Sequence, residues 1–302
     1  MWHRELWMHL GLMRFNTKGW AMKDWEDHTL TEEERLAFEK DGYFLVENAL
    51  PPEDLARVVD VVDGLDAEHC AQENTESRGR LNMHDLIGKN DVFMDLMDWP
   101  RTFPKAFGIL GWNIQLFHTQ LVMTPPGTDR EYKKRLGFHQ DNNRMNRDFE
   151  TPRETHPRVS MKVAFFLTDT TEVGRANFYI VPGAHAQEGV RYVDDETFFP
   201  EGAIATQVKA GDAVVFDRRL WHAASPNITG HPRKVLFYGY SYRWLRTKSN
   251  MNLEHLYDQV DPIRKQLIGY ATSGNGRFAP LDEDVPLRDW IEEHLGEEAV
   301  VG

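Results

Sequence analysis

The chain has 302 residues, of which 41% are hydrophobic and 27% are charged, and its formal net charge is −13. This composition is that of a globular protein with a sizeable core, and the acidic balance argues against a broad nucleic-acid-binding surface. The single cysteine, Cys70, excludes internal disulfides and cysteine-rich zinc sites, which suits a cytoplasmic protein.

The N-terminal part of the chain predicts helices on either side of a short strand. The first stretch, MWHRELWMHLGLMRF, is interrupted by charged residues, so we interpret it as an amphipathic element and not as a signal peptide. Thr31 and Glu34 then form a capping box that starts a helix, and Gly42 ends it. YFLVENAL predicts a strand, residues 51–70 predict a second helix, and the polar residues 70–90 predict a loop.

From Asn113 onwards the apolar pattern changes to the period of two that is typical of strands. NIQLFHTQLVMT alternates until PPG stops it, and further β-rich runs are VSMKVAFFLTD, NFYIVPG, ATQVKAGDAVVFD and KVLFYGYSYRW. Short strands separated by turn residues predict a sandwich or barrel. After Trp244, NLEHLYDQVDPIRKQLIG and PLRDWIEEHL predict helices. We therefore expect a mainly β (α+β) fold with flanking helices and no membrane-spanning segment.

A histidine and a carboxylate stand two positions apart in FHQD, as His139 and Asp141. Residues two apart in a strand point to the same side, so both can bind one metal ion. An Fe(II) facial triad consists of two neutral imidazoles and one carboxylate, and leaves positions open for a cosubstrate and oxygen. The best partner is His222, in GDAVVFDRRLWHAASPN. We predict these three residues as metal ligands and as the catalytic centre.

Arg233 follows His222 by eleven positions, at the start of the next predicted strand. A guanidinium is the natural bidentate partner for the carboxylate that a chelating 2-oxoglutarate extends away from the metal. A surface salt bridge is the alternative role for such an arginine.

The segments FHQD, PGAH, GDAVVFDRRLWHAASPNIT and PRKV resemble the phytanoyl-CoA dioxygenase (PhyH-like) family of iron- and 2-oxoglutarate-dependent oxygenases, over residues 31–244. The resemblance implies a double-stranded β-helix, the jelly-roll or cupin-like core, over about residues 113–244. Together with the predicted helices in 1–70 and 245–302, this core is expected to form one PhyH-like domain over residues 1–302. The resemblance also implies Fe(II), 2-oxoglutarate and O2 as cofactor and cosubstrates, bound through the predicted ligands and Arg233.

Two further residues are predicted cosubstrate contacts. Gln120 matches a strand position at which family members can hydrogen-bond 2-oxoglutarate, although the wet face of an edge strand is the alternative. Thr229, four residues before Arg233, is placed to support the same carboxylate, and a turn role is its alternative.

The chain departs from the family pattern before PGAH. Family members often have NGAL or NGPL there, whereas this chain has GRANFYIVPGAH, in which Arg175 and Asn177 either alter a turn or add a polar group to the pocket. We interpret His185 in PGAH as a structural turn histidine, and expect His118 and His231 to be hydrogen-bonded or exposed. Related halogenases replace the carboxylate ligand with a small residue, so Asp141 argues against halogenation and favours hydroxylation or another iron-dependent oxidation such as desaturation, epimerisation or ring closure.

The predicted function is a metal-binding oxidoreductase, an Fe(II)/2-oxoglutarate-dependent dioxygenase. We expect it to hydroxylate an unactivated carbon of a small polar metabolite or natural-product intermediate and to release succinate and CO2. Asn143, Arg144 and Trp221 are the predicted substrate contacts. The expected partner is this small molecule, and the expected state is a monomer or homodimer. A metal-dependent binding or sensing protein, and a cupin-like enzyme that does not use 2-oxoglutarate, are the alternatives.

Overall fold

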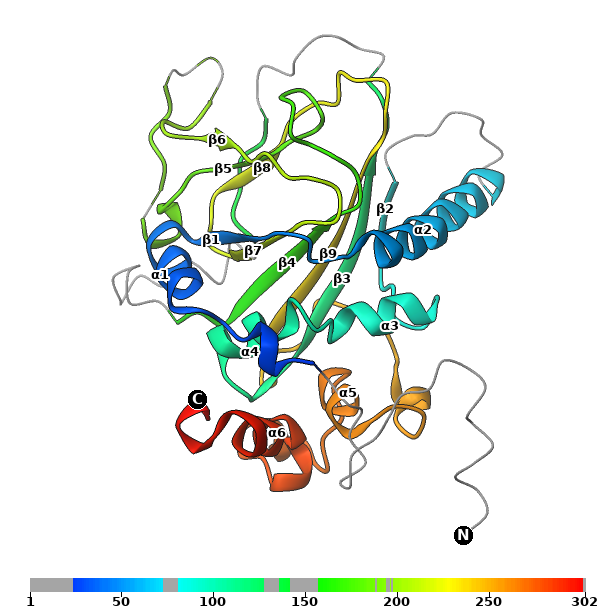
Figure 1. The fold of residues 1–302 in the computed structure, drawn as a ribbon, viewed down its shortest axis with the longest axis vertical. Coiled ribbons are helices and arrows are strands. Elements are labelled where there is room, and N and C mark those ends of the chain that lie inside the picture. The colour runs from blue at the N-terminus through cyan, green and yellow to red at the C-terminus, as the bar shows by residue number, and fades with distance from the viewer. Residues whose placement is uncertain are drawn as a thin grey trace.

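Two antiparallel β-sheets form the centre of the computed structural model, which describes residues 24–72, 81–127, 136–141, 157–187, 189–193, 196 and 198–300 (Figure 1). The six-stranded sheet has the order β1-β7-β4-β9-β3-β2, and the three-stranded sheet has the order β6-β5-β8. The strands are β1 (Tyr43–Val46), β2 (Leu81–His84), β3 (Ile114–Thr124), β4 (Ser160–Phe166), β5 (Phe178–Ile180), β6 (Ile204–Ala205), β7 (Ala213–Asp217), β8 (His222–Ala224) and β9 (Arg233–Tyr242).

Helices cover one face of the large sheet, and the small sheet faces the other. The helices are α1 (Glu32–Asp41), α2 (Pro52–Gln72), α3 (Asp91–Met97), α4 (Phe103–Leu110), α5 (Pro262–Leu267) and α6 (Pro286–Leu295). In the part of the chain that the structure describes, no helix is both long and apolar enough to cross a membrane. The predicted mainly β jelly-roll fold with flanking helices is confirmed.

Strand β4 shows how both faces of the large sheet are buried. All seven of its residues are buried. Met161, Val163 and Phe165 join the core beneath the helices, whereas Ala164 and Phe166 join the core between the two sheets. Lys162 lies two residues before Ala164 and four before Phe166, so its side chain is on the same face of the strand and points between the sheets. This inner space is where a site can form.

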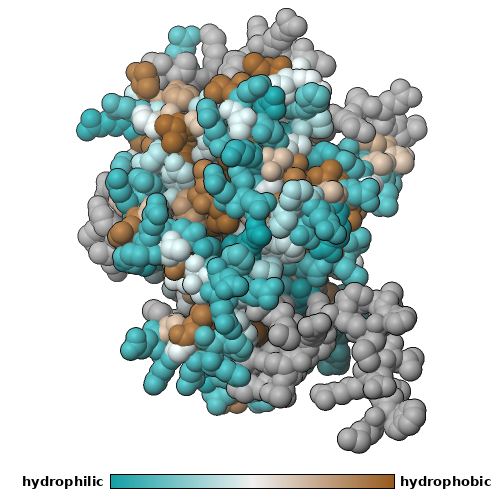
Figure 2. Space-filling model, in the orientation of Figure 1, coloured by the Kyte–Doolittle hydropathy of each residue, from teal (hydrophilic) through white to brown (hydrophobic). Residues whose placement is uncertain are grey.

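The outer core ties the ends of the described chain to the large sheet. The Trp25 ring lies 4.9 Å from Phe103 of α4 and 4.7 Å from Trp290 of α6. Tyr238 and Tyr240 of β9 donate hydrogen bonds to the Phe93 and Met97 carbonyl oxygens of α3, at 3.0 and 2.6 Å. The face shown in Figure 2 is largely hydrophilic, and apolar side chains interrupt it in scattered groups.

The structure confirms some of the predicted helix signals and corrects others. The capping box of Thr31 and the C-cap of Gly42 are both present in α1, as predicted. The predicted helix over 252–269 is wrong in extent, because the Asp261 side chain caps a new start and α5 covers only Pro262–Leu267. Strand β2 lies in a segment predicted as loop, and α3 and α4 were not predicted. The amphipathic element over 1–15 lies outside the described residues.

Candidate metal centre

Three side chains from two separate chain segments meet at the inner face of the barrel. His139, Asp141 and His222 each offer a ligand atom, and these atoms all lie within 4.8 Å of one another. Asp141 and His222 are buried, and His139 is exposed. This is the group that the His-x-Asp motif and the distant histidine predict.

Backbone hydrogen bonds hold these two segments side by side. The His139 amide donates to the His222 carbonyl at 3.0 Å, and the His222 amide donates back to the His139 carbonyl at 2.9 Å. The Asp141 amide donates to the Arg218 carbonyl at 2.9 Å. The two imidazole rings are consequently 4.4 Å apart between centroids. The geometry depends on the pairing of β8 with the 139–141 segment, and not on local sequence alone.

The tautomers of both rings suit a metal ligand. His139 Nδ1 lies 3.0 Å from the Gly137 carbonyl oxygen, and His222 Nδ1 lies 2.8 Å from that of Leu220. A carbonyl oxygen only accepts, so each Nδ1 carries the proton and each Nε2 presents a lone pair. Two Nε2 atoms and one carboxylate are the donor set of a facial iron triad. The residues present fit such a metal ion.

The electrostatics keep this donor set in its metal-binding form. Burial lowers the pKa of His222 to about 4, so the ring is neutral at neutral pH. Burial alone would raise the pKa of Asp141, but the Lys162 ammonium at 2.7 Å and the His222 ring outweigh it and hold that pKa below its ordinary value. Asp141 is therefore ionised.

A cavity of about 320 Å³ opens over these ligands. Both Arg233 and Gln120 line it, together with the apolar side chains Val122, Phe178 and Phe237. Thr229 and Trp221 do not line it, and Asn143 and Arg144 lie outside the described residues. A volume of this size suits a small molecule.

Arg233 is the first residue of β9 and is 3% exposed, with its guanidinium 5.5 Å from the centre of the Phe166 ring. An exposed salt bridge is therefore not its role. Gln120 lies on β3 between β2 and β9, and its amide donates to Asn82 Oδ1 at 2.8 Å. The edge-strand alternative for Gln120 is wrong, because β2 pairs with β3.

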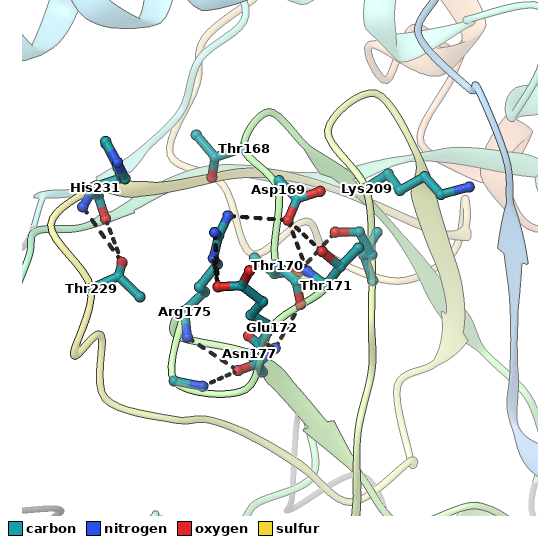
Figure 3. A network of polar contacts seen from close by, with 12 residues as sticks. Thr168, Asp169, Thr170, Thr171, Glu172, Arg175, Asn177, Lys209, Thr229 and His231 are labelled. Carbon is teal, nitrogen blue, oxygen red and sulfur yellow. Dashed lines mark hydrogen bonds and ion pairs between the residues drawn. The ribbon is translucent and has the colours of Figure 1, made fainter.

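The region that departs from the family pattern is a polar network outside this cavity (Figure 3). The buried Asn177 side chain accepts from the Gly174 amide at 2.8 Å and donates to the Thr170 carbonyl at 2.7 Å. Arg175 pairs with Asp169 and Glu172 at 3.2 and 2.9 Å. Arg175 and Asn177 therefore stabilise the turn before β5 and do not line the cavity, so the expectation of an added polar group in the pocket is wrong.

Thr229 belongs to a neighbouring turn. Its hydroxyl donates to Asn227 Oδ1 at 2.7 Å, which is the turn role given as its alternative. Near the metal centre, Arg219 pairs with the buried Asp217 at 2.8 Å, and the Arg219 carbonyl accepts from the Gln140 side chain. These contacts fasten the 217–219 turn to the segment that carries His139.

Three other polar side chains at this site were not predicted to function there. Lys162 and Lys248 line the cavity, and His118 is a buried neighbour of Lys162. Neither ring nitrogen of His118 has a hydrogen-bond partner among the described residues, so its expected hydrogen bond or exposure is wrong. His185 is structural as expected, since it packs against Gly42 and contacts the Glu39 carbonyl. The sequence signal that could have identified Lys162 is its position within the apolar run VSMKVAFFL, where a charged residue is unusual.

Comparison with known proteins gives consistent matches. The model of the phytanoyl-CoA dioxygenase family matches residues 38–235. Ectoine dioxygenase from Nocardia farcinica is 27% identical over 240 residues, which cover 68% of this chain and 76% of the relative. Dioxygenase af480 from Aspergillus fumigatus is 31% identical over 227 residues, 68% of this chain and 69% of the relative.

The fold also matches a solved structure. HygX from Streptomyces hygroscopicus, with nickel and 2-oxoglutarate bound, superposes with a TM-score of 0.57 at 15% identity. The match covers 72% of this chain and 89% of HygX. At this identity the likeness concerns the fold.

Proposed function

This chain belongs to the phytanoyl-CoA dioxygenase family and is an Fe(II)- and 2-oxoglutarate-dependent oxygenase, and from this premise we propose that it hydroxylates an unactivated carbon of a small polar metabolite or natural-product intermediate. The observation that carries the proposal is the convergence of His139, Asp141, His222 and Arg233 on one small cavity. The balanced reaction converts the substrate C–H bond, O2 and 2-oxoglutarate to an alcohol, succinate and CO2.

Each residue has a distinct task in this proposal. His139 and His222 hold the metal ion through Nε2, and Asp141 holds it through a carboxylate oxygen. When bound, the iron supplies the oxygen-activating chemistry, for which 2-oxoglutarate is the reductant. Arg233 binds the distal carboxylate of 2-oxoglutarate, for which a buried guanidinium is well suited. Phe178 and Phe237 exclude water from the cavity, which limits unproductive oxidation.

The remaining predicted contacts stay proposals of lower rank. Gln120 lines the cavity and is a candidate partner for 2-oxoglutarate. Thr229 acts through the turn before Arg233 in this proposal, since its hydroxyl is bonded to Asn227. Trp221, Asn143 and Arg144 remain predictions that substrate-bound structures would test. We also propose a cytoplasmic location, which the free Cys70 supports. The proposed monomer or homodimer is testable by sedimentation.

The decisive experiment is a titration of the apoprotein with Fe(II) and then 2-oxoglutarate in the absence of oxygen, followed by visible spectroscopy. We expect a weak charge-transfer band that requires both additions. Arg233→Ala should need at least about tenfold more 2-oxoglutarate, equivalent to about 1.4 kcal/mol. Arg175→Ala is the matched control, because this arginine pairs with Asp169 and Glu172 outside the cavity and should titrate as wild type.

The alternatives give different spectra. Iron binding without any 2-oxoglutarate band would contradict the oxygenase proposal and favour a sensing protein or a cupin-like enzyme. Succinate release that rises with an added metabolite would identify the substrate and complete the assignment.

A further inference from the structure

The cavity contains more positive charge than its cofactors require. Arg233, Lys162 and Lys248 all line it, and Asp141 is the one carboxylate among its described lining residues. A ferrous ion and Arg233 together carry three positive charges, which the two carboxylates of 2-oxoglutarate and Asp141 balance. Both lysine charges are then left over. Lys162 is only 7% exposed, and its ion-pair partner among the described residues is Asp141, whose charge a bound ferrous ion would share, so a further anion beside this ammonium is favourable.

Lys162 and His118 lie in one row across three neighbouring strands. His118 of β3 pairs with Gly239 of β9, and Gly239 pairs with Lys162 of β4. Gly239 has no side chain, and a Cβ placed there would lie 2.5 Å from His118 Nδ1. The imidazole therefore leans over β9 towards Lys162, and does not stand upright on β3.

His118 is a buried polar group whose ring nitrogens take no part in hydrogen bonding among the described residues. The side chain is 2% exposed, and neither ring nitrogen makes a hydrogen bond within the described part of the chain. Leaving such a group unsatisfied costs about 1–3 kcal/mol. A neutral imidazole offers one donor and one acceptor, so a polar atom of a ligand can satisfy it.

Lys248 reaches the same place from another segment. Its backbone amide donates to the Phe117 carbonyl at 3.0 Å, which fixes the lysine beside His118 at the rim of the cavity. Lys248 is exposed, whereas Lys162 and His118 are buried. Lys248 contributes an exposed charge to the lining of the cavity and Lys162 a buried one, and the His118 ring lies next to them behind this lining. Together they form a graded entry for an anion.

We propose that Lys162, Lys248 and His118 form an anion subsite that binds a carboxylate or phosphate group of the substrate, an inference that rests on the proposed oxygenase function. The two lysines supply the charge that the cofactors leave unbalanced, and His118 supplies a directional hydrogen bond. Because the subsite adjoins Asp141, through Lys162 at 2.7 Å, the bound anion places the rest of a small substrate beside the metal ligands.

The test uses paired probes that differ in charge and little in shape. Cyclopentanecarboxylate is compared with cyclopentanecarboxamide, and glycerol 3-phosphate with glycerol, on protein loaded with Fe(II) and 2-oxoglutarate without oxygen. The readouts are the perturbation of the charge-transfer band and the heat of binding. We expect at least one acid to bind about tenfold or more tighter than its neutral counterpart while the band persists. The pair that responds more strongly identifies the anion as carboxylate or phosphate.

Lys248 provides the cleanest variants, because it is exposed and does not touch a proposed metal ligand. Lys248→Met should weaken the acid about tenfold, leave the neutral probe unchanged and keep 2-oxoglutarate affinity within about twofold. Lys248→Arg should retain acid binding. His118→Leu should also weaken the acid, with its melting temperature recorded to establish folding. Lys162 is left intact because it contacts Asp141.

Other outcomes overturn the subsite and leave the oxygenase assignment standing. Equal binding of the acid and neutral probes would overturn the subsite, and so would the absence of acid binding at about 10 mM. Loss of the charge-transfer band would also overturn it, because the acid would then be displacing 2-oxoglutarate from Arg233. Unchanged acid affinity in Lys248→Met would also overturn it. If wild-type protein forms no band with Fe(II) and 2-oxoglutarate, the proposed function fails and the subsite fails with it.

Discussion

Asp141 shows how much of the centre depends on individual residues and how much on their neighbours. The two-residue spacing to His139 is visible in the sequence, and it predicts a shared direction in a strand. The ion pair between Asp141 and Lys162 is not visible in the sequence, because the two residues are 21 positions apart and only the folded structure brings them together. The sequence therefore predicts the ligand set, and the structure adds the charge that surrounds it.

Removing any ligand should abolish turnover. We expect His139→Ala, Asp141→Ala and His222→Ala each to retain less than about a thousandth of the wild-type activity, because the donor set acts as a unit. Iron binding measured by calorimetry should weaken in parallel. His231→Ala is the control, since this exposed histidine lies outside the cavity. Full activity in a ligand variant would reassign the site.

Asp217 gives a prediction about stability. The carboxylate is fully buried and accepts from Arg219 at 2.8 Å and from Arg158 at 3.2 Å. Burial alone would raise the pKa of Asp217. The hydrogen bonds and the charge of Arg219 lower this pKa by more than burial raises it, so the net shift is downward. A lowered folded-state pKa stabilises the protein above the unfolded pKa of about 3.9, and this stabilisation is lost as the pH falls through the folded pKa.

We therefore expect Asp217→Asn to be less stable by about 3–5 kcal/mol at pH 7, and the difference from wild type to shrink in acid. Urea unfolding at pH 7 and below pH 4 measures both values. Asp169→Asn is the matched control, because Asp169 is 39% exposed in its pair with Arg175 and should cost about 1 kcal/mol or less. A difference independent of pH would show that packing, and not charge, is what Asp217 contributes.

At the scale of elements, sequence periodicity predicts the strands better than the helices. The runs that contain β3, β4 and β9 are long and β-rich, and each forms a strand. The segment over 252–269 has helical residues throughout, but Asp261 and Pro262 form a strong start signal and restrict α5 to the second part. The position of His118 could not be predicted, because it depends on Gly239 in a strand more than a hundred residues later.

Gly239 should be intolerant of a side chain. A Cβ there would meet the His118 ring at 2.5 and 2.8 Å, and the ring is enclosed. We expect Gly239→Ala to lower stability by about 1–3 kcal/mol through overpacking. Gly64 lies in the middle of α2, and a Cβ added there would meet no other atom of the described residues within 4 Å beyond its own helix backbone. Gly64→Ala should therefore raise stability by about 0.5–1 kcal/mol. Thermal melting of both variants tests this, and a neutral Gly239→Ala would mean that His118 has another rotamer available.

At the scale of the whole molecule, the family match ends at residue 235 but the core does not. Trp290 of α6 is 1% exposed and packs against Trp25 and Phe107, at 4.7 and 6.2 Å between ring centres. Phe107 and Trp25 in turn belong to the core under the large sheet. The single domain expected over 1–302 remains a prediction, and these contacts make a specific test of it possible.

If the C-terminal helices and the sheet form one cooperative unit, Trp290→Ala should destabilise the entire fold by about 3–5 kcal/mol, because a large buried ring leaves a cavity. Urea unfolding followed by fluorescence and by far-ultraviolet circular dichroism should then give one coincident transition, shifted to lower urea. Trp244→Ala is the control, as that ring is 43% exposed and should cost far less. A separate early transition in Trp290→Ala, with the main midpoint unchanged, would instead show that α5 and α6 unfold as their own unit and that the jelly-roll core does not need them.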